Sequence, residues 1–151
     1  MTSKTCRSQQ GVEMTGTREE RNWKALNAGA FMAMVGPLTR VQNEDGSFVY
    51  ALQTRHEHEN ALGLIHGGVI TALLDQAISM VAWTAADRAP TVTVQMDTRF
   101  VSAAKPGTFL EARAKIRHQT GSLMFLDAEV SDGEHTVALA TAVMKILRKA
   151  A

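Results

Sequence analysis

The feature that most constrains this chain is a stretch without Lys, Arg or Glu that runs from Asn60 to Ala86. From Gly67 onward its apolar residues recur at the spacing of an α-helix, and both sides of that helix are small or apolar. Such a helix is expected to be covered nearly all round. At 1.5 Å per residue, a helix over 67–86 spans about 30 Å. The stretch therefore predicts one long core helix that contains a single carboxylate, Asp75.

A membrane span is the alternative explanation for so apolar a stretch. Asp75 would then lie near the centre of the bilayer, where a carboxylate costs about 3 kcal/mol on insertion scales. A helix in the core of a soluble protein is therefore expected, with no membrane association. The first twenty residues are polar and lack the apolar region of a signal peptide, which makes the cytoplasm the expected location.

Length and charge limit the class of protein. The chain has 151 residues, which suits one domain, and we expect a flexible segment over 1–18 followed by a single domain over 19–151. Lys and Arg number 16 against 15 Asp and Glu, a balance that argues against a nucleic-acid partner and against disorder. The one cysteine, Cys6, excludes an internal disulfide and a cysteine-rich zinc module.

Shorter elements are expected on both sides of the core helix. Before it, the pattern predicts a helix over 18–35 that ends at Gly36-Pro37, then strands over 38–41 and 48–52. After it, alternating residues and turn signals predict four long strands, which we expect to form an antiparallel meander: 92–100, 110–117, 123–130 and 135–147. A long helix on such a sheet is an α+β fold. The unpaired edge of the sheet predicts at least a homodimer.

Four residues in or beside the core helix could perform chemistry. Gly67 and Gly68 lie where a loop becomes the helix, so their N–H groups could hold an anion or a developing oxyanion, or the pair could simply allow a close contact between helix and sheet. Asp75 is functional, or bonded to a neighbouring hydroxyl such as Thr71 or Ser79, or facing a partner subunit. Asn60 could orient a water molecule or simply form a turn.

Two further groups of polar residues have a structural and a functional interpretation. His56 and His58 would share one face of a strand and could bind zinc together with His66, but no fourth ligand follows at a familiar spacing and no metal is expected. A row on the strand over 110–117 is most simply a solvated outer face, with the binding of substrate phosphates as the alternative; it consists of Glu111, Arg113, Lys115 and Arg117.

The combined pattern resembles a known family. Asn60-x-x-Gly63-x-x-His66-Gly67-Gly68, followed by Asp75-x-Ala77, is similar to the signature of the hotdog-fold thioesterases of the phenylacetate-degradation (PaaI-like) type. The expected order of elements is similar too, over roughly residues 25–147. The resemblance implies a hotdog fold, in which an antiparallel sheet wraps a long central helix. It also implies hydrolysis of acyl-CoA thioesters with neither a metal nor a bound cofactor.

The resemblance also implies a role for each matching residue. Asp75 corresponds to a general base or nucleophile, and the Gly67 N–H to the donor that polarises the thioester carbonyl. Asn60 corresponds to a residue that helps to hold the attacking water or the thioester, and His66 to one that shapes the site. Gly68 and Thr93 are the expected substrate contacts. Family sites lie between the two subunits of a homodimer, and many members assemble as homotetramers.

Two other activities fit the same family of folds. One is a non-catalytic acyl-CoA-binding protein, although the sequence shows no added DNA-binding domain. The other is an acyl-thioester dehydratase, in which His66 and Asp75 would act as the catalytic pair. The His-Gly-Gly spacing favours hydrolysis over both.

Overall fold

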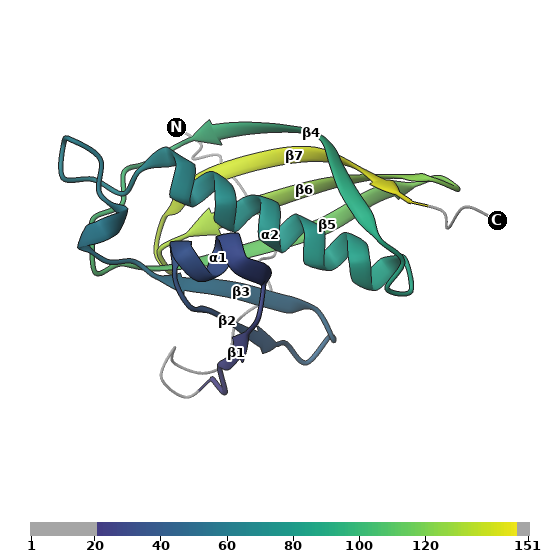
Figure 1. The fold of residues 1–151 in the computed structure, drawn as a ribbon, viewed down its shortest axis with the longest axis horizontal. Helices are drawn as coiled ribbons and strands as arrows, with labels where there is room; N and C mark the ends of the chain where they lie inside the picture. Colours follow the sequence, from purple (N-terminus) through teal and green to yellow (C-terminus); the bar gives the residue numbers. More distant parts are fainter. Residues whose placement is uncertain (1–20, 148–151) are drawn as a thin grey trace, which may run out of the picture.

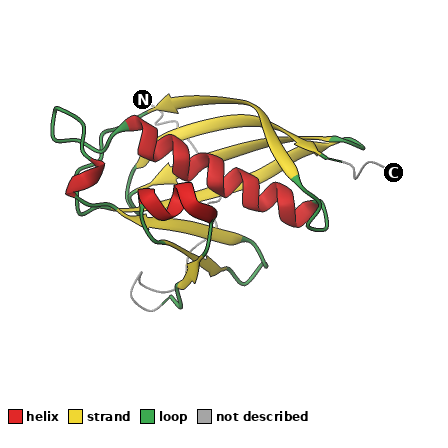
Figure 2. Cartoon of the chain, viewed as in Figure 1, coloured by secondary structure: helices red, strands yellow, loops and turns green. Residues whose placement is uncertain are grey.

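A long helix lying across an antiparallel sheet dominates the fold (Figures 1 and 2). The computed structural model describes residues 21–147, so the segment predicted to be flexible, 1–18, lies outside the described residues. The helix is α2 (Gly67–Ala85), and the expected core helix is confirmed to within one residue at its end. The sheet has seven strands, every neighbouring pair of which is antiparallel. The α+β architecture predicted from the sequence is therefore confirmed.

The order of the strands differs from a simple meander. The order is β1-β2-β3-β5-β6-β7-β4, so β4 pairs with β7 at one edge, and β5 pairs with β3 in the middle of the sheet. The predicted four-strand meander is thus wrong at its first step and holds only for β5, β6 and β7. The strands are β1 (Lys24–Leu26), β2 (Leu38–Gln42), β3 (Phe48–Gln53), β4 (Thr91–Phe100), β5 (Phe109–Gln119), β6 (Leu123–Ser131) and β7 (Thr136–Ile146).

The link between β4 and β5 explains this order. Residues 101–108 do not form a tight turn but cross the end of the sheet, where neighbouring segments satisfy their backbone groups. The Val101 N–H donates to the Val137 carbonyl at 2.8 Å, and the Ala104 carbonyl accepts from the Ile65 N–H at 2.9 Å. These bonds carry the chain from the edge strand to the centre of the sheet, because buried backbone groups need partners.

The N-terminal helix is shorter than predicted. The structure forms β1 at Lys24–Leu26 and only then α1 (Gly29–Val35), so the expected helix over 18–35 is wrong in its described N-terminal half. β1 is extended because it pairs with β2. Gly29 has a φ of +86°, and its N–H donates to Asn27 Oδ1 at 3.1 Å, which fixes a turn just before the helix. A strand pairing and a turn thus replace the first helical residues.

The core lies between the inner side of α2 and the sheet. The largest fully buried side chains there are Tyr50, Leu52, Leu73, Leu74, Ile78, Leu110, Met124, Leu126 and Met144. Burial of each such side chain contributes about 1.5–3 kcal/mol. By length and a mean hydropathy of 1.3, α2 also qualifies as a possible membrane span, but its inner side packs on the sheet as in a core helix. The absence of membrane association stays a prediction.

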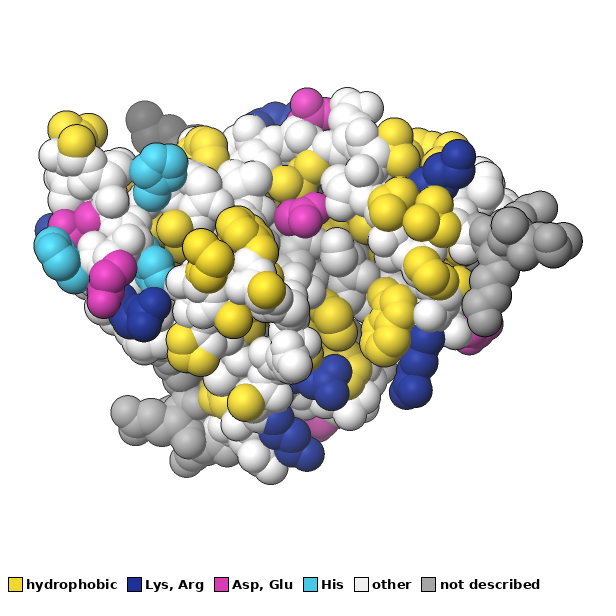
Figure 3. All heavy atoms as spheres, in the orientation of Figure 1, with side chains coloured by type: hydrophobic (Ala, Val, Ile, Leu, Met, Phe, Trp, Pro, Cys, Tyr) yellow, Lys and Arg dark blue, Asp and Glu magenta, His cyan; other side chains and the backbone are white. Residues whose placement is uncertain are grey.

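The opposite side of α2 is not covered within one chain, contrary to the expectation of a helix enclosed all round. Asp75 and Met80 are half-buried and Trp83 is exposed. Figure 3 shows hydrophobic side chains gathered over α1 and over the C-terminal end of α2 on this face. Val92, Val94 and Phe100 are exposed along β4, whose outer edge pairs with no strand in the part of the chain that the structure describes.

Candidate active site

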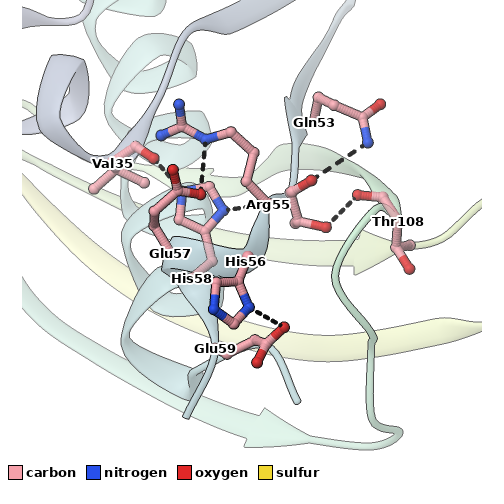
Figure 4. Close-up of polar contacts among 9 residues, drawn as sticks. Val35, Gln53, Arg55, His56, Glu57, His58, Glu59 and Thr108 are labelled. Carbon is pink, nitrogen blue, oxygen red and sulfur yellow. Dashed lines mark hydrogen bonds and ion pairs between the residues drawn. The ribbon is translucent and has the colours of Figure 1, made fainter. Parts of the chain in front are cut away.

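A short 3₁₀ helix, η1 (His56–His58), anchors the loop that leads into α2 (Figure 4). The His58 ring is buried; its Nδ1 accepts from the Arg55 N–H at 3.1 Å, and its Nε2 bonds the Val35 carbonyl. Since Nδ1 accepts and Nε2 donates, the ring is the neutral tautomer. The His58 carbonyl in turn accepts from the His66 N–H at 2.8 Å. His58 therefore links the end of α1 to His66, the residue just before α2.

The histidines do not form the arrangement that a zinc site would need. His56 and His58 lie on η1 rather than on a strand, so the expectation that their rings share one strand face is wrong. His56 Nδ1 bonds Glu59 Oε1 at 2.8 Å, and this contact raises the pKa of the imidazole. The described residues contain no group of three or more His, Cys, Asp or Glu side chains that could hold a metal ion.

Asn60 shapes the loop before the helix. Its Oδ1 accepts from the Leu62 N–H at 2.9 Å and from the Leu64 N–H at 3.2 Å. Gly63 closes the same turn with a φ of +72°, a conformation that favours glycine. The turn that the sequence allowed for Asn60 is confirmed, and its contact with a water molecule or a thioester stays a prediction.

The two glycines at the start of α2 differ in what their N–H groups do. His66 is the N-cap, and its Nδ1 accepts from the Gly68 N–H at 2.9 Å. A Cβ at position 68 would lie 3.1 Å from that nitrogen, so glycine suits the cap. The Gly67 N–H, by contrast, donates to no acceptor among the described residues. Of the two glycines, Gly67 therefore has the N–H that is open among the described residues, while substrate contact by Gly68 stays a prediction.

Asp75 lies on the uncovered side of α2 and bonds a hydroxyl on β4. Its Oδ1 accepts from Thr93 Oγ1 at 2.7 Å. The sequence allowed a neighbouring hydroxyl as partner, but that hydroxyl comes from the edge strand rather than from Thr71 or Ser79. Thr93 therefore lies beside the carboxylate, while its contact with the substrate stays a prediction.

A β-bulge gives Thr93 this orientation. Strict alternation along β4 would place Thr93 on the face opposite Met96 and Phe100. Thr93 is paired with Met144 and Gln95 with Val143, so Val94 is an extra residue in the strand. The bulge reverses the alternation and turns Thr93 toward α2. Nothing in the local sequence marks Val94 as the extra residue, so this feature could not be predicted.

The candidate residues form two groups along the helix. Asn60, His66, Gly67 and Gly68 lie at its start, and Asp75 with Thr93 lies in its middle. Asp75 follows Gly67 by eight residues, which is about 12 Å along a helix axis. A carboxylate must be within hydrogen-bond distance of the reacting atoms, directly or through one water molecule. Asp75 is too far along the axis for that from a carbonyl held by Gly67 of its own chain.

The charged row on β5 is only partly a solvated face. Glu111 is buried and bonds Arg113 at 2.6 Å and Arg21 at 3.6 Å, so the expectation of a solvated side chain is wrong at this position. Further along, Arg117 pairs with Asp127 at 2.6 Å. Carboxylates therefore accompany the cations at these positions, and the binding of substrate phosphates to this face stays a prediction.

Comparisons with known proteins identify the family of the chain. The family model described as the thioesterase superfamily matches residues 62–139. Human acyl-coenzyme A thioesterase 13 is 28% identical over 121 residues, which cover 80% of this chain and 86% of that protein.

Two solved structures are similar in both sequence and fold. A mutant of the phenylacetic acid degradation protein PaaI from Thermus thermophilus is 28% identical with a TM-score of 0.69, over 78% of this chain and 98% of that one. A Bacillus halodurans protein solved with CoA is 31% identical with a TM-score of 0.67, over 74% of each chain. The chain therefore belongs to the thioesterase superfamily, as a hotdog-fold member of the PaaI-like type.

Proposed function

We propose that this protein hydrolyses acyl-CoA thioesters to the free acid and CoA, without a metal or a bound cofactor, in the cytoplasm. The observation that carries the proposal is the open Gly67 N–H at the start of a helix whose middle holds the Thr93-bonded carboxylate of Asp75. The relatives named as acyl-CoA thioesterases and the similar structure that contains CoA support the choice of substrate class.

In the proposed reaction, the Gly67 N–H binds and stabilises the carbonyl oxygen of the thioester. Attack on a thioester places negative charge on the carbonyl oxygen. An N–H donor at the start of a helix stabilises that charge, and one such donor is worth about 3–4 kcal/mol in mutational tests. The His66 cap holds the Gly68 N–H, so the neighbouring Gly67 N–H is left for the substrate.

Asp75 acts as the general base or as the nucleophile. As a general base it removes a proton from water while the water oxygen adds to the carbonyl carbon; the C–S bond then breaks and the sulfur leaves with a proton as the thiol of CoA. As a nucleophile, the Asp75 carboxylate would attack the carbonyl carbon and form a mixed anhydride as the C–S bond breaks and CoA leaves. Water would then cleave the anhydride to the free acid and regenerate Asp75. After a single turnover in ¹⁸O-labelled water, label in the Asp75 carboxylate would identify the anhydride route, because water attack on the thioester itself places the label only in the acid product.

Because about 12 Å along the helix axis separates Gly67 from Asp75, we infer that each active site is shared by two subunits. Thr93 and Phe100 lie near opposite ends of β4 and both face α2. Antiparallel pairing of two copies of β4 about a two-fold axis would bring Asp75 of one subunit toward Gly67 of the other. It would also cover the exposed edge. Two such dimers would then assemble as the homotetramer expected from the family.

A thiol-release assay on a panel of acyl-CoAs tests the activity. Stoichiometric release of CoA and free acid is the expected result. Tight binding of acyl-CoA without release would identify a binding protein instead. Addition of water across the double bond of an enoyl-CoA, with the thioester intact, would identify a dehydratase, the activity that His66 and Asp75 could otherwise serve.

A further inference from the structure

Phe100 is a large aromatic side chain in an unusual place. Its side chain lies on the face of β4 that is turned toward α2, yet 56% of the residue is exposed within one chain. Residues on this face of the sheet normally contribute to the core. The strand partner of Phe100 is the small residue Ala138, so the ring is free to extend toward the start of α2.

The tip of the Phe100 ring points at the backbone of Gly67. A Cβ built on Gly67 would lie 3.0 Å from Cζ of the ring, and 3.3 Å and 3.5 Å from its two Cε atoms. The φ of Gly67 is not positive, so backbone strain does not explain the need for glycine here. The ring therefore packs against the residue that carries the open N–H, and it occupies the space that a side chain at position 67 would take.

We propose that Phe100 is a specificity-determining residue that selects acyl groups with an unbranched carbon next to the thioester carbonyl. This inference rests on the proposed function. A carbonyl oxygen bonded to Gly67 would lie about 2.7–3.1 Å from its nitrogen. The acyl carbon next to the carbonyl carbon is two covalent bonds from that oxygen: one C=O bond of about 1.2 Å and one C–C bond of about 1.5 Å. A methyl branch on that carbon would therefore meet the ring, whereas a CH₂ group would lie flat against it.

The experiment compares acyl-CoA isomers of equal carbon number. Each pair contains a straight-chain acyl group and its isomer with a methyl group on the carbon next to the carbonyl, so hydrophobicity is matched and only shape differs. We expect the wild type to favour the straight isomer at least tenfold in kcat/KM, since one misplaced methyl group in a pocket typically changes kcat/KM about 10- to 200-fold.

Two variants test the role of the ring. In Phe100→Ala, the kcat/KM values for the straight and branched isomers should lie within threefold of each other, because kcat/KM for the branched isomers rises. Phe100→Leu should give a ratio between those of the wild type and Phe100→Ala. Phe100→Leu keeps an apolar side chain, which preserves the test if the alanine variant does not fold. Phe125→Leu is the matched control because Phe125 is an exposed aromatic residue that lines the groove on the outer face of the sheet. Its ratio should equal that of the wild type.

The outcomes separate this inference from the proposed function. Hydrolysis with a ratio that Phe100→Ala and Phe100→Leu leave unchanged would overturn the role of Phe100 alone. An equal loss on both isomers would do the same, since the ring would then contact the CoA side of the thioester or serve only the fold. Failure of the wild type to hydrolyse any acyl-CoA would overturn both.

Discussion

Asp75 is a half-buried carboxylate in an otherwise uncharged helix, and it accepts a hydrogen bond from the Thr93 hydroxyl. Asp75→Asn keeps the shape and a hydrogen-bonding oxygen but removes the base, so it should lower kcat at least 100-fold, because general-base help is worth about 10²–10⁴. The melting temperature should change little. Thr93→Val, which removes only the hydroxyl, should have a smaller effect. An Asp75→Asn enzyme within threefold of the wild type would contradict the assignment.

The candidate site residues whose positions could be predicted from the sequence are those whose arrangement is local. Asn60, His66, Gly67 and Asp75 lie within one loop and the helix that follows it, and helical spacing relates Gly67 to Asp75 directly. The side on which Thr93 lies depends on a bulge in a strand pair formed with β7, far along the chain. Nothing in the local sequence indicates a role for Phe100, because the contact between Phe100 and Gly67 depends on β4 lying beside the start of α2.

At the scale of elements, the start of α2 depends on the His66 cap. His66→Ala removes the acceptor for the Gly68 N–H and should lower the free energy of unfolding by about 1 kcal/mol. His66→Asn should restore most of that stability, because asparagine is a strong N-cap. Denaturant unfolding of the three proteins measures the difference. Equal stability of the alanine and asparagine variants would show that the cap contributes nothing.

The elements also show where prediction from sequence ends. The helix over 67–86 was predicted almost to the residue because its periodicity is a property of twenty adjacent positions. The position of β4 at the sheet edge was not predicted, because the alternation of apolar and polar residues along a strand does not specify which strand it pairs with. The same limit applies to β1, where pairing with β2 replaced the expected helix.

At the scale of the whole molecule, a single chain leaves the edge of β4 and the outer side of α2 uncovered. We therefore expect a mass in light scattering at two or four times 16.4 kDa, at micromolar concentration. The interface should bury more than about 1,000 Å², as specific contacts do. Val94→Lys should weaken the assembly, because a charge on an edge strand opposes pairing, and activity should fall with the loss of dimer. A monodisperse monomer with full activity would contradict the shared site.

Mixing two inactive variants tests directly whether the site is shared. Asp75→Asn keeps the Gly67 donor. Gly67→Val keeps the carboxylate, but its side chain should obstruct the substrate beside the N–H, where a Cβ would lie 3.0 Å from Phe100 Cζ. If each site takes Gly67 from one subunit and Asp75 from the other, a mixed dimer has one intact site and one site that carries both changes. Random exchange of equal amounts makes half of the dimers mixed, so activity should recover to about one quarter of the wild-type value. Native mass spectrometry should confirm that the subunits have exchanged. Mixed dimers no more active than their parents would show that each site lies within one chain.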